Sequence, residues 1–267
     1  MAYNYLKNLV IPRLIVKHQF KLRSFSTKSL NDTKEKAPSA LIPVGLLVKP
    51  TMLSEVQKPT LWEKLTKPAS TSSPEQRQKE LLNEMKRSTI QDFNEVRRFN
   101  GKLFYSPPRL FKEKSALWMY NFHGKSLRNQ YKELYKDWQG SPFFFALFSN
   151  AFGENQCRNW IQHLAPFDYL PVRYANVQSN LIKYWLQKIF IGKVKRSIPE
   201  KCWNEYITAY DNKFSFPEIG WNNKLVGNVY LIDDSCKIRW LGTGDPTNVE
   251  IENLKTAIKF LVNKNVG

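Results

Sequence analysis

The sequence predicts an α/β fold in which a βαβ unit is followed by a further helix, a β-hairpin and a last helix. After Pro142, short apolar runs of strand length alternate with amphipathic stretches of helix length. The chain has 267 residues, of which 42% are hydrophobic, so it can bury a sizeable core. A helix between two strands makes that pair parallel, whereas a short turn makes the last pair antiparallel.

Each element has its own signal in the sequence. Phe143–Phe148 is a continuous apolar run, which is typical of a buried strand. Residues 154–164 form the helix that follows it. Residues 171–177 form the second strand, and residues 180–196 form a strongly amphipathic helix. The turn Asp234-Ser235-Cys236 joins the strands 227–233 and 237–242, and Asp245-Pro246 caps a last helix to Val262. This order is the thioredoxin-like arrangement.

The part of the chain before the βαβ unit predicts a helical extension. Ser73-Pro74-Glu75-Gln76 has the pattern of a capping box, and Asn100-Gly101 ends the helix, so the extension covers 74–103. The thioredoxin-like domain then covers 104–267. Within it we expect a small hairpin of 118–121 and 125–127, a short helix at 128–138 and an aromatic insertion at 197–226.

Positive charge is concentrated at the start of a chain whose formal net charge is +18. Residues 1–31 contain no acid, and basic and apolar residues alternate there before a run of hydroxyl residues. This composition predicts a mitochondrial transit peptide at 1–25, with a secretory signal and an ordinary basic arm as alternatives. Residues 26–73 are rich in Pro, Ser and Lys, which favours a linker or an extended arm.

The cysteines argue against the redox chemistry that this fold usually carries. The first strand-to-helix turn, residues 149–157, has no C-x-x-C, and Cys157 comes at least one turn into the helix. Cys202 lies in the insertion and Cys236 in the hairpin turn, so neither can pair with Cys157 at this helix start. A proline directly before the third strand, which is usual in redox-active members of the fold, is also missing at Gly227. The histidines are too few and scattered for a metal site, and no phosphate-binding glycine motif occurs. We therefore expect no enzyme activity and no cofactor, with a thiol or peroxide oxidoreductase as an alternative.

A basic, acid-free stretch from Tyr169 to Pro199 allows three interpretations. The ordinary one is that the apolar stripe of its helix packs on the sheet while the lysines are solvated. The second is an interfacial helix, with Trp185 and Phe190 at the lipid boundary and Lys193 and Arg196 on anionic headgroups. The third is an RNA- or mitoribosome-binding surface, although no RNA-binding signature accompanies it.

The C-terminal third carries a recognisable pattern. Leu225-Val226-Gly227 opens a strand, Asp233 begins the turn, Ile238-Arg239-Trp240 forms the next strand, and Glu250 and Glu252 follow in the last helix. With the earlier block around Phe143–Phe148, Asn150-Ala151-Phe152 and Trp160, this resembles the mitochondrial ATP synthase assembly-factor family that chaperones subunit 6 (subunit a) of the membrane sector. The pattern departs at Cys236, where a glycine is common.

This resemblance implies a redox-silent chaperone that is peripheral on the matrix side of the mitochondrial inner membrane. It implies binding to newly made subunit 6 until that subunit meets the subunit c ring, and no nucleic acid partner. By analogy with where this fold usually binds, we expect contact at Phe152 and at Arg239-Trp240, with Arg239 exposed. For Trp240, burial in the core is an equal alternative.

Overall fold

In a computed structural model of the chain, the described residues are 37–52, 90–211 and 216–263. The expected transit peptide at 1–25 lies outside these residues, as do the first part of the expected helical extension and most of the expected linker. In the described part, a seven-stranded sheet has the order β2-β1-β5-β4-β3-β6-β7.

The centre of the sheet confirms the predicted fold class. Strand β3 (Phe143–Phe148) is parallel to β4 (Val172–Gln178), and helix α4 (Ala151–Ile161) and the 3-10 helix η1 (Gln162–Phe167) lie between them in the chain. Strands β6 (Asn228–Ile232) and β7 (Ile238–Thr243) form the antiparallel hairpin beside β3, and α7 (Asn248–Asn263) follows. This is the thioredoxin-like topology expected from the sequence.

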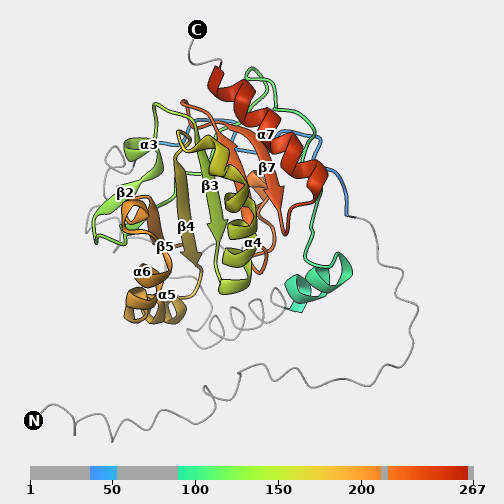
Figure 1. Cartoon of the computed structure of the whole chain (residues 1–267). Helices are drawn as coiled ribbons and strands as arrows, with labels where there is room; N and C mark the ends of the chain where they lie inside the picture. Colours follow the sequence, from blue (N-terminus) through green and yellow to red (C-terminus); the bar gives the residue numbers. More distant parts are fainter. Residues whose placement is uncertain (1–36, 53–89, 212–215, 264–267) are drawn as a thin grey trace, which may run out of the picture. The chain divides into compact units, whose positions relative to one another are not determined.

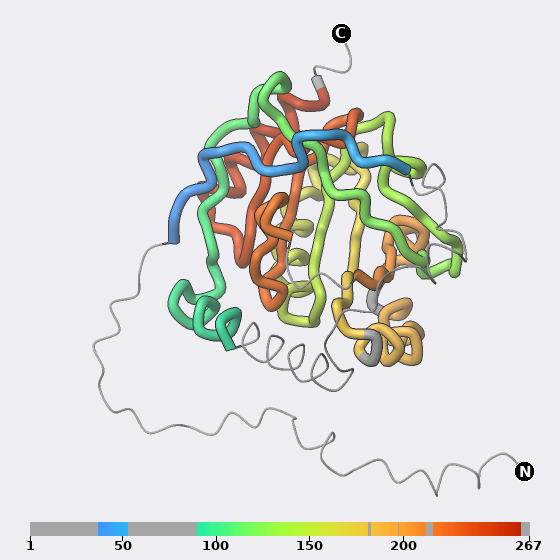
Figure 2. The backbone as a smooth tube through the Cα atoms, turned by 180° about the vertical axis from the view of Figure 1, so that it is seen from behind, coloured from blue at the N-terminus to red at the C-terminus, as the bar shows by residue number. Residues whose placement is uncertain are grey.

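Different structures cover the two faces of the sheet. Helices α4 and α7 cover one face, as Figure 1 shows, and bury an apolar cluster that includes Trp160, Trp240 and Ile258. The opposite face has a second cluster, centred on aromatic side chains such as Phe145 and Tyr230. Residues 37–52 cross this opposite face (Figure 2), and Ala40, Val44 and Met52 pack against its cluster. Both faces of the central strands are therefore buried.

The outer edge of β7 is paired with an irregular segment of the chain. The Phe111 amide donates to the Arg239 carbonyl at 2.8 Å, and the Ile238 amide donates to the Leu117 carbonyl at 2.8 Å. Trp118 forms isolated antiparallel bridges to Lys237 on one side and to Leu46 on the other. At the opposite end of the sheet, the edge strand β2 (Tyr131–Glu133) has three residues. A short strand is one way in which proteins protect a sheet edge.

The segments before β3 only partly match the prediction. Residues 90–98 are helical, so the described part of the expected extension, 90–103, is helical only as far as residue 98. The expected linker is described at 37–52, where it is an extended arm packed on the domain. The hairpin expected at 118–121 and 125–127 is wrong: β1 (His123–Ser126) pairs with β2. The helix expected at 128–138 is reduced to α3 (Leu134–Asp137), because β2 takes its first half.

The expected insertion at 197–226 contains a strand of the sheet. Strand β5 (Tyr206–Tyr210) is parallel to β4 and antiparallel to β1, and it lies between them. Short 3-10 helices flank it, η2 (Glu200–Cys202) and η3 (Pro217–Ile219). The single helix expected at 180–196 is divided at Phe190 into α5 (Leu181–Ile189) and α6 (Ile191–Ser197).

Candidate functional site

The carboxyl ends of the parallel strands β3, β4 and β5 meet at one edge of the sheet. In Figure 1 this is the lower edge, where α4 begins and where α5 and α6 lie. Ligands of open α/β sheets bind at this edge, so the side chains there are the candidates for function.

Asn150 and Ser149 occupy the start of α4, where a redox protein would hold its cysteines. The Asn150 side-chain oxygen accepts from the Gly153 amide at 2.9 Å, and its amide donates to the Lys224 carbonyl at 2.8 Å and the Leu225 carbonyl at 3.1 Å. The Ser149 hydroxyl donates to the same Lys224 carbonyl at 2.6 Å. These bonds cap the helix and attach it to the segment before β6.

Gly153 and Gly227 allow that attachment to be close. A side chain at Gly227 would clash with the Gly153 carbonyl oxygen, because a Cβ there would lie 2.1 Å from it. Glycine is the residue that permits such a backbone approach. The start of α4 and the segment before β6 are therefore in direct main-chain contact at this point.

The cysteines lie in environments that suppress thiolate formation. Cys157 is buried in the second turn of α4, its thiol faces the Asn228 carbonyl at 3.5 Å, and burial raises its pKa. Burial also raises the pKa of Cys236 to about 12, and it raises the pKa of the partly buried Cys202. Because the thiolate is the reactive form, these three thiols are poor nucleophiles near neutral pH.

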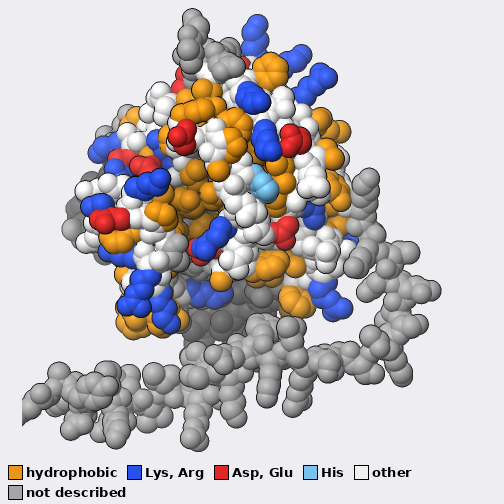
Figure 3. Space-filling model, in the orientation of Figure 1, with side chains coloured by type: hydrophobic (Ala, Val, Ile, Leu, Met, Phe, Trp, Pro, Cys, Tyr) orange, Lys and Arg blue, Asp and Glu red, His pale blue; other side chains and the backbone are white. Residues whose placement is uncertain are grey.

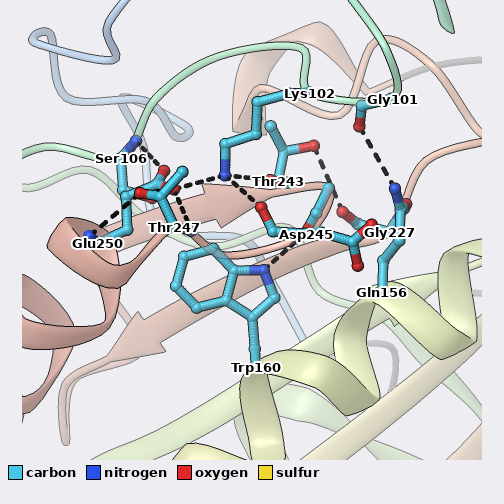
Figure 4. Close-up of polar contacts among 11 residues, drawn as sticks. Gly101, Lys102, Ser106, Gln156, Trp160, Gly227, Thr243, Asp245, Thr247 and Glu250 are labelled. Carbon is cyan, nitrogen blue, oxygen red and sulfur yellow. Dashed lines mark hydrogen bonds and ion pairs between the residues drawn. The ribbon is translucent and has the colours of Figure 1, made fainter.

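A polar network fastens the segment that enters the domain. Lys102 lies 2.7 Å from a Glu250 carboxylate oxygen and donates to the carbonyls of Thr243 and Asp245 at 2.9 Å each (Figure 4). Burial alone would raise the pKa of Glu250, but the Lys102 charge and hydrogen bonds from Ser106 and Thr247 hold it below its usual value. The network joins the 101–106 segment to β7 and α7, so its charges serve the structure.

Gln156 joins the same segment to α4 and to the start of β6. Its amide donates to the Gly101 carbonyl at 3.3 Å, and its oxygen accepts from the Gly227 amide at 3.0 Å (Figure 4). Among the described residues, no group of three or more His, Cys, Asp or Glu is arranged to hold a metal ion.

Helix α5 has its apolar face on the outside. Trp185 is 61% exposed and Ile189 54%, and Leu186 and Phe190 are exposed beside them. Tyr184 and Gln187, on the other side of the helix, are the less exposed residues. A surface helix of a globular domain normally turns its apolar stripe inward. The interpretation that this stripe packs on the sheet is therefore wrong for these four residues.

Basic residues surround this apolar face. Lys183 and Lys188 lie on α5, and the expected site residues Lys193 and Arg196 are exposed on α6. Figure 3 shows the blue side chains of this region above and beside an orange patch at the lower left, over α5 and α6. In the described part of the chain, no helix is long and apolar enough to span a membrane.

Three further predicted site residues have different surroundings. Phe152 is 50% exposed on the first turn of α4, as a contact residue requires. Arg239 is 7% exposed, and it donates to the Phe111 carbonyl at 2.9 Å and pairs with Asp233 at 3.5 Å. Trp240 is fully buried, with its indole donating to the Pro107 carbonyl at 2.9 Å. The expectation that Arg239 and Trp240 form a surface is therefore wrong.

Sequence reasoning also missed residues at this edge. Ile90 and Phe93, on the helix at 90–98, are 61% and 49% exposed. Apolar spacing identifies the face of a helix and does not say what covers it, so the sequence did not reveal this exposure.

Comparisons with known proteins agree with one another. A family model described as "ATP10 protein" matches residues 25–261. A Candida glabrata protein called "Mitochondrial ATPase complex subunit ATP10" is 27% identical over 224 residues, which are 80% of this chain and 81% of that protein. The Saccharomyces cerevisiae protein of the same name is 25% identical over 258 residues, 86% of this chain and 92% of that protein.

Similar solved structures are more distant. A DsbF homologue from Corynebacterium diphtheriae superposes with a TM-score of 0.41 at 14% identity and covers 58% of this chain and 92% of its own. BsSco is described as a member of the Sco family of cytochrome c oxidase assembly proteins. It superposes with a TM-score of 0.38 at 13% identity and covers 56% of this chain and 97% of its own. The fold assignment rests on the sheet topology described above.

Proposed function

Because the chain belongs to the ATP10 protein family, we propose that it is a non-enzymatic assembly factor of the mitochondrial ATP synthase. In this proposal it binds newly made subunit 6 (subunit a) at the matrix face of the inner membrane and promotes its association with the subunit c ring. A membrane subunit that carries polar groups within its helices needs a partner until its ring is available. The observation that carries the proposal is the outward apolar face of α5 with its flanking cations.

Peripheral attachment to the inner membrane follows from the same face. Aromatic and aliphatic side chains can enter the headgroup boundary while cations beside them meet anionic lipid. The exposed residue Phe152 at the start of α4 is then the proposed contact to the client. The buried thiols weigh against the oxidoreductase alternative, because burial raises their pKa.

Site-specific photo-crosslinking in mitochondria with labelled translation products tests the proposal. A crosslinker at Trp185 or Phe152 is expected to capture newly made subunit 6. Phe260 on α7 is 70% exposed and serves as the matched control position, from which we expect no capture. Equal capture from all three positions, or none from Trp185 and Phe152, would contradict this surface.

Deletion of the protein tests the function independently of the surface. We expect faster turnover of subunit 6 and slower assembly of the ATP synthase. Normal stability and assembly of subunit 6 in its absence would contradict the chaperone role. Nuclease-sensitive cosedimentation of the protein with mitoribosomes would favour the RNA-binding alternative instead.

A further inference from the structure

A cleft of about 240 Å³ lies between the sheet and the helix pair α5–α6. Three of the residues that line it are lysines from three different elements: Lys125 on β1, Lys188 on α5 and Lys195 on α6. The polar residues Ser126, Asn129 and Thr208 also line it. The fold thus brings together cations that are up to seventy positions apart in the sequence.

The positive charge of this cleft is not neutralised by the protein. No carboxylate lines it, and within the described ranges no ion pair links any of the three lysines to an acid. The Lys188 ammonium lies 4.3 Å from the centroid of the Tyr184 ring, and the Lys195 ammonium lies 4.9 Å from that of Trp203. These cation–π contacts hold the side chains in place and leave their charges uncompensated.

A neighbouring side chain also lacks a partner. Both polar atoms of the Gln187 amide, next to Lys188, are buried and have no hydrogen-bond partner among the described residues. Buried amide groups in folded proteins are almost always hydrogen-bonded, so the Gln187 amide has hydrogen-bonding capacity that the described residues do not use.

We propose that the cleft binds the phosphate of an anionic phospholipid headgroup when α5 lies on the membrane surface. Phosphate oxygens only accept hydrogen bonds, and lysine ammonium groups only donate them. The volume is smaller than the roughly 300–1,000 Å³ of pockets that enclose drug-sized ligands, which suits a headgroup. Lys188 is also next to Ile189 of the outward apolar face, so a lipid whose chains meet that face has its phosphate near the cleft. This inference rests on the proposed membrane attachment of α5.

Vesicle flotation with the full chain tests the cleft. The cleft variant carries Lys125→Gln, Lys188→Gln and Lys195→Gln. The surface variant carries Lys183→Gln, Lys193→Gln and Arg196→Gln, which removes the same total of three positive charges, all from α5 and α6, without touching the lining of the cleft. On phosphatidylcholine vesicles containing phosphatidylglycerol, we expect the cleft variant to lose about tenfold more affinity than the surface variant, because it loses charge-assisted hydrogen bonds as well as long-range attraction.

Control measurements separate this proposal from the proposed function. Failure of the unchanged protein to bind these vesicles would remove the membrane attachment, and the cleft proposal with it. Equal losses in the two triple variants would overturn the cleft alone, since diffuse charge would then explain the binding. Thermal unfolding of each variant shows whether the fold is kept, and single lysine replacements decide the matter if the triple cleft variant does not fold.

Two other ligands are outcomes of the same experiment. If inorganic phosphate binds the unchanged protein but not the cleft variant, while both float equally with anionic vesicles, a soluble phosphate is the ligand and the lipid assignment is wrong. A preference for single-stranded RNA over vesicles, lost in the cleft variant, would equally overturn it.

Discussion

Arg239 and Asp233 form an ion pair whose side chains are 9% and 6% exposed. Both charges are therefore largely removed from water, and each depends on the other for compensation. Removing one partner of a buried pair leaves the other charge without compensation, which costs about 3–5 kcal/mol. We therefore expect Arg239→Ala to lower the free energy of unfolding by this amount in urea denaturation. This reverses the expectation for an exposed arginine, whose removal would leave folding nearly intact.

A surface ion pair supplies the control for Arg239. Arg158 pairs with Glu154 at 3.1 Å on α4 and is 55% exposed, so Arg158→Ala should cost less than about 1 kcal/mol. Similar losses in the two variants would show that the buried pair has no special role.

Cys236 lies in the hairpin turn with a φ of 69°, the left-handed region in which a Cβ is unfavourable. The Asp233 carboxylate stabilises this turn, because it accepts hydrogen bonds from the backbone amides of Ser235 at 3.1 Å and Lys237 at 2.8 Å. Both Cys236→Ala and Cys236→Gly remove the same buried sulfur. Only glycine relieves the backbone, so we expect Cys236→Gly to be more stable than Cys236→Ala by about 1 kcal/mol in thermal or urea unfolding. The opposite order would mean that the turn changes conformation.

The burial of Arg239 and Trp240 could be predicted only in part from the sequence. Alternation correctly places Arg239 and Trp240 on opposite faces of β7. Both are buried because α4 and α7 cover one face, and the segment around Phe111 contacts the strand from its edge. That segment has no periodic pattern of its own, so its position follows only from long-range contacts.

The attachment of helix α7 to the rest of the domain depends on the negative charge of Glu250 near the start of the helix. Glu250 accepts hydrogen bonds from the Ser106 amide at 2.8 Å and the Thr247 amide at 2.9 Å and pairs with Lys102. A carboxylate whose folded pKa is lowered contributes stability above its unfolded pKa, and this contribution is lost as the pH falls through the folded pKa. Since the pKa of Glu250 is lowered, Glu250→Gln should lose about 3 kcal/mol at pH 7, and the difference should shrink as the pH falls through the folded pKa of Glu250.

Urea denaturation at a series of pH values measures this dependence. Glu252 is on the same helix and pairs with Lys255 at the exposed surface, so Glu252→Gln should leave stability unchanged at every pH. A difference between the native chain and Glu250→Gln that stays constant as the pH falls through the folded pKa of Glu250 would contradict the assignment.

Elements were predictable where the pattern is local. The continuous apolar run of β3 and the turn between β6 and β7 identify these strands without reference to the rest of the chain. Strand β5 was missed because its place is determined by pairing with β1 and β4, which are distant in sequence. The stripe of α5 was visible as a pattern, but its outward orientation depends on tertiary packing and could not be read from the spacing.

For the whole molecule, the outward face of α5 should contribute to association and not to folding. Replacing both Trp185 and Ile189 by serine should change the free energy of unfolding by less than about 0.5 kcal/mol, because both side chains are already more than half exposed. The same variant should self-associate less, which sedimentation velocity measures. Trp221 is fully buried, and Trp221→Ser should cost about 3–5 kcal/mol as the contrasting control. A large loss of stability in the Trp185 and Ile189 variant would mean that the face is covered within the native molecule.

The paired edge of β7 restricts how this protein can recognise another chain. Strand addition needs a row of free amide and carbonyl groups, and the segment around Phe111 and Leu117 already bonds the Arg239 carbonyl and the Ile238 amide. A membrane helix likewise has its main-chain groups satisfied internally. A membrane helix therefore has no main chain to share with β7, whose first residues are already paired. Selectivity for such a client would come from the shape and charge of side chains, and the protein could release it without breaking a β-ladder.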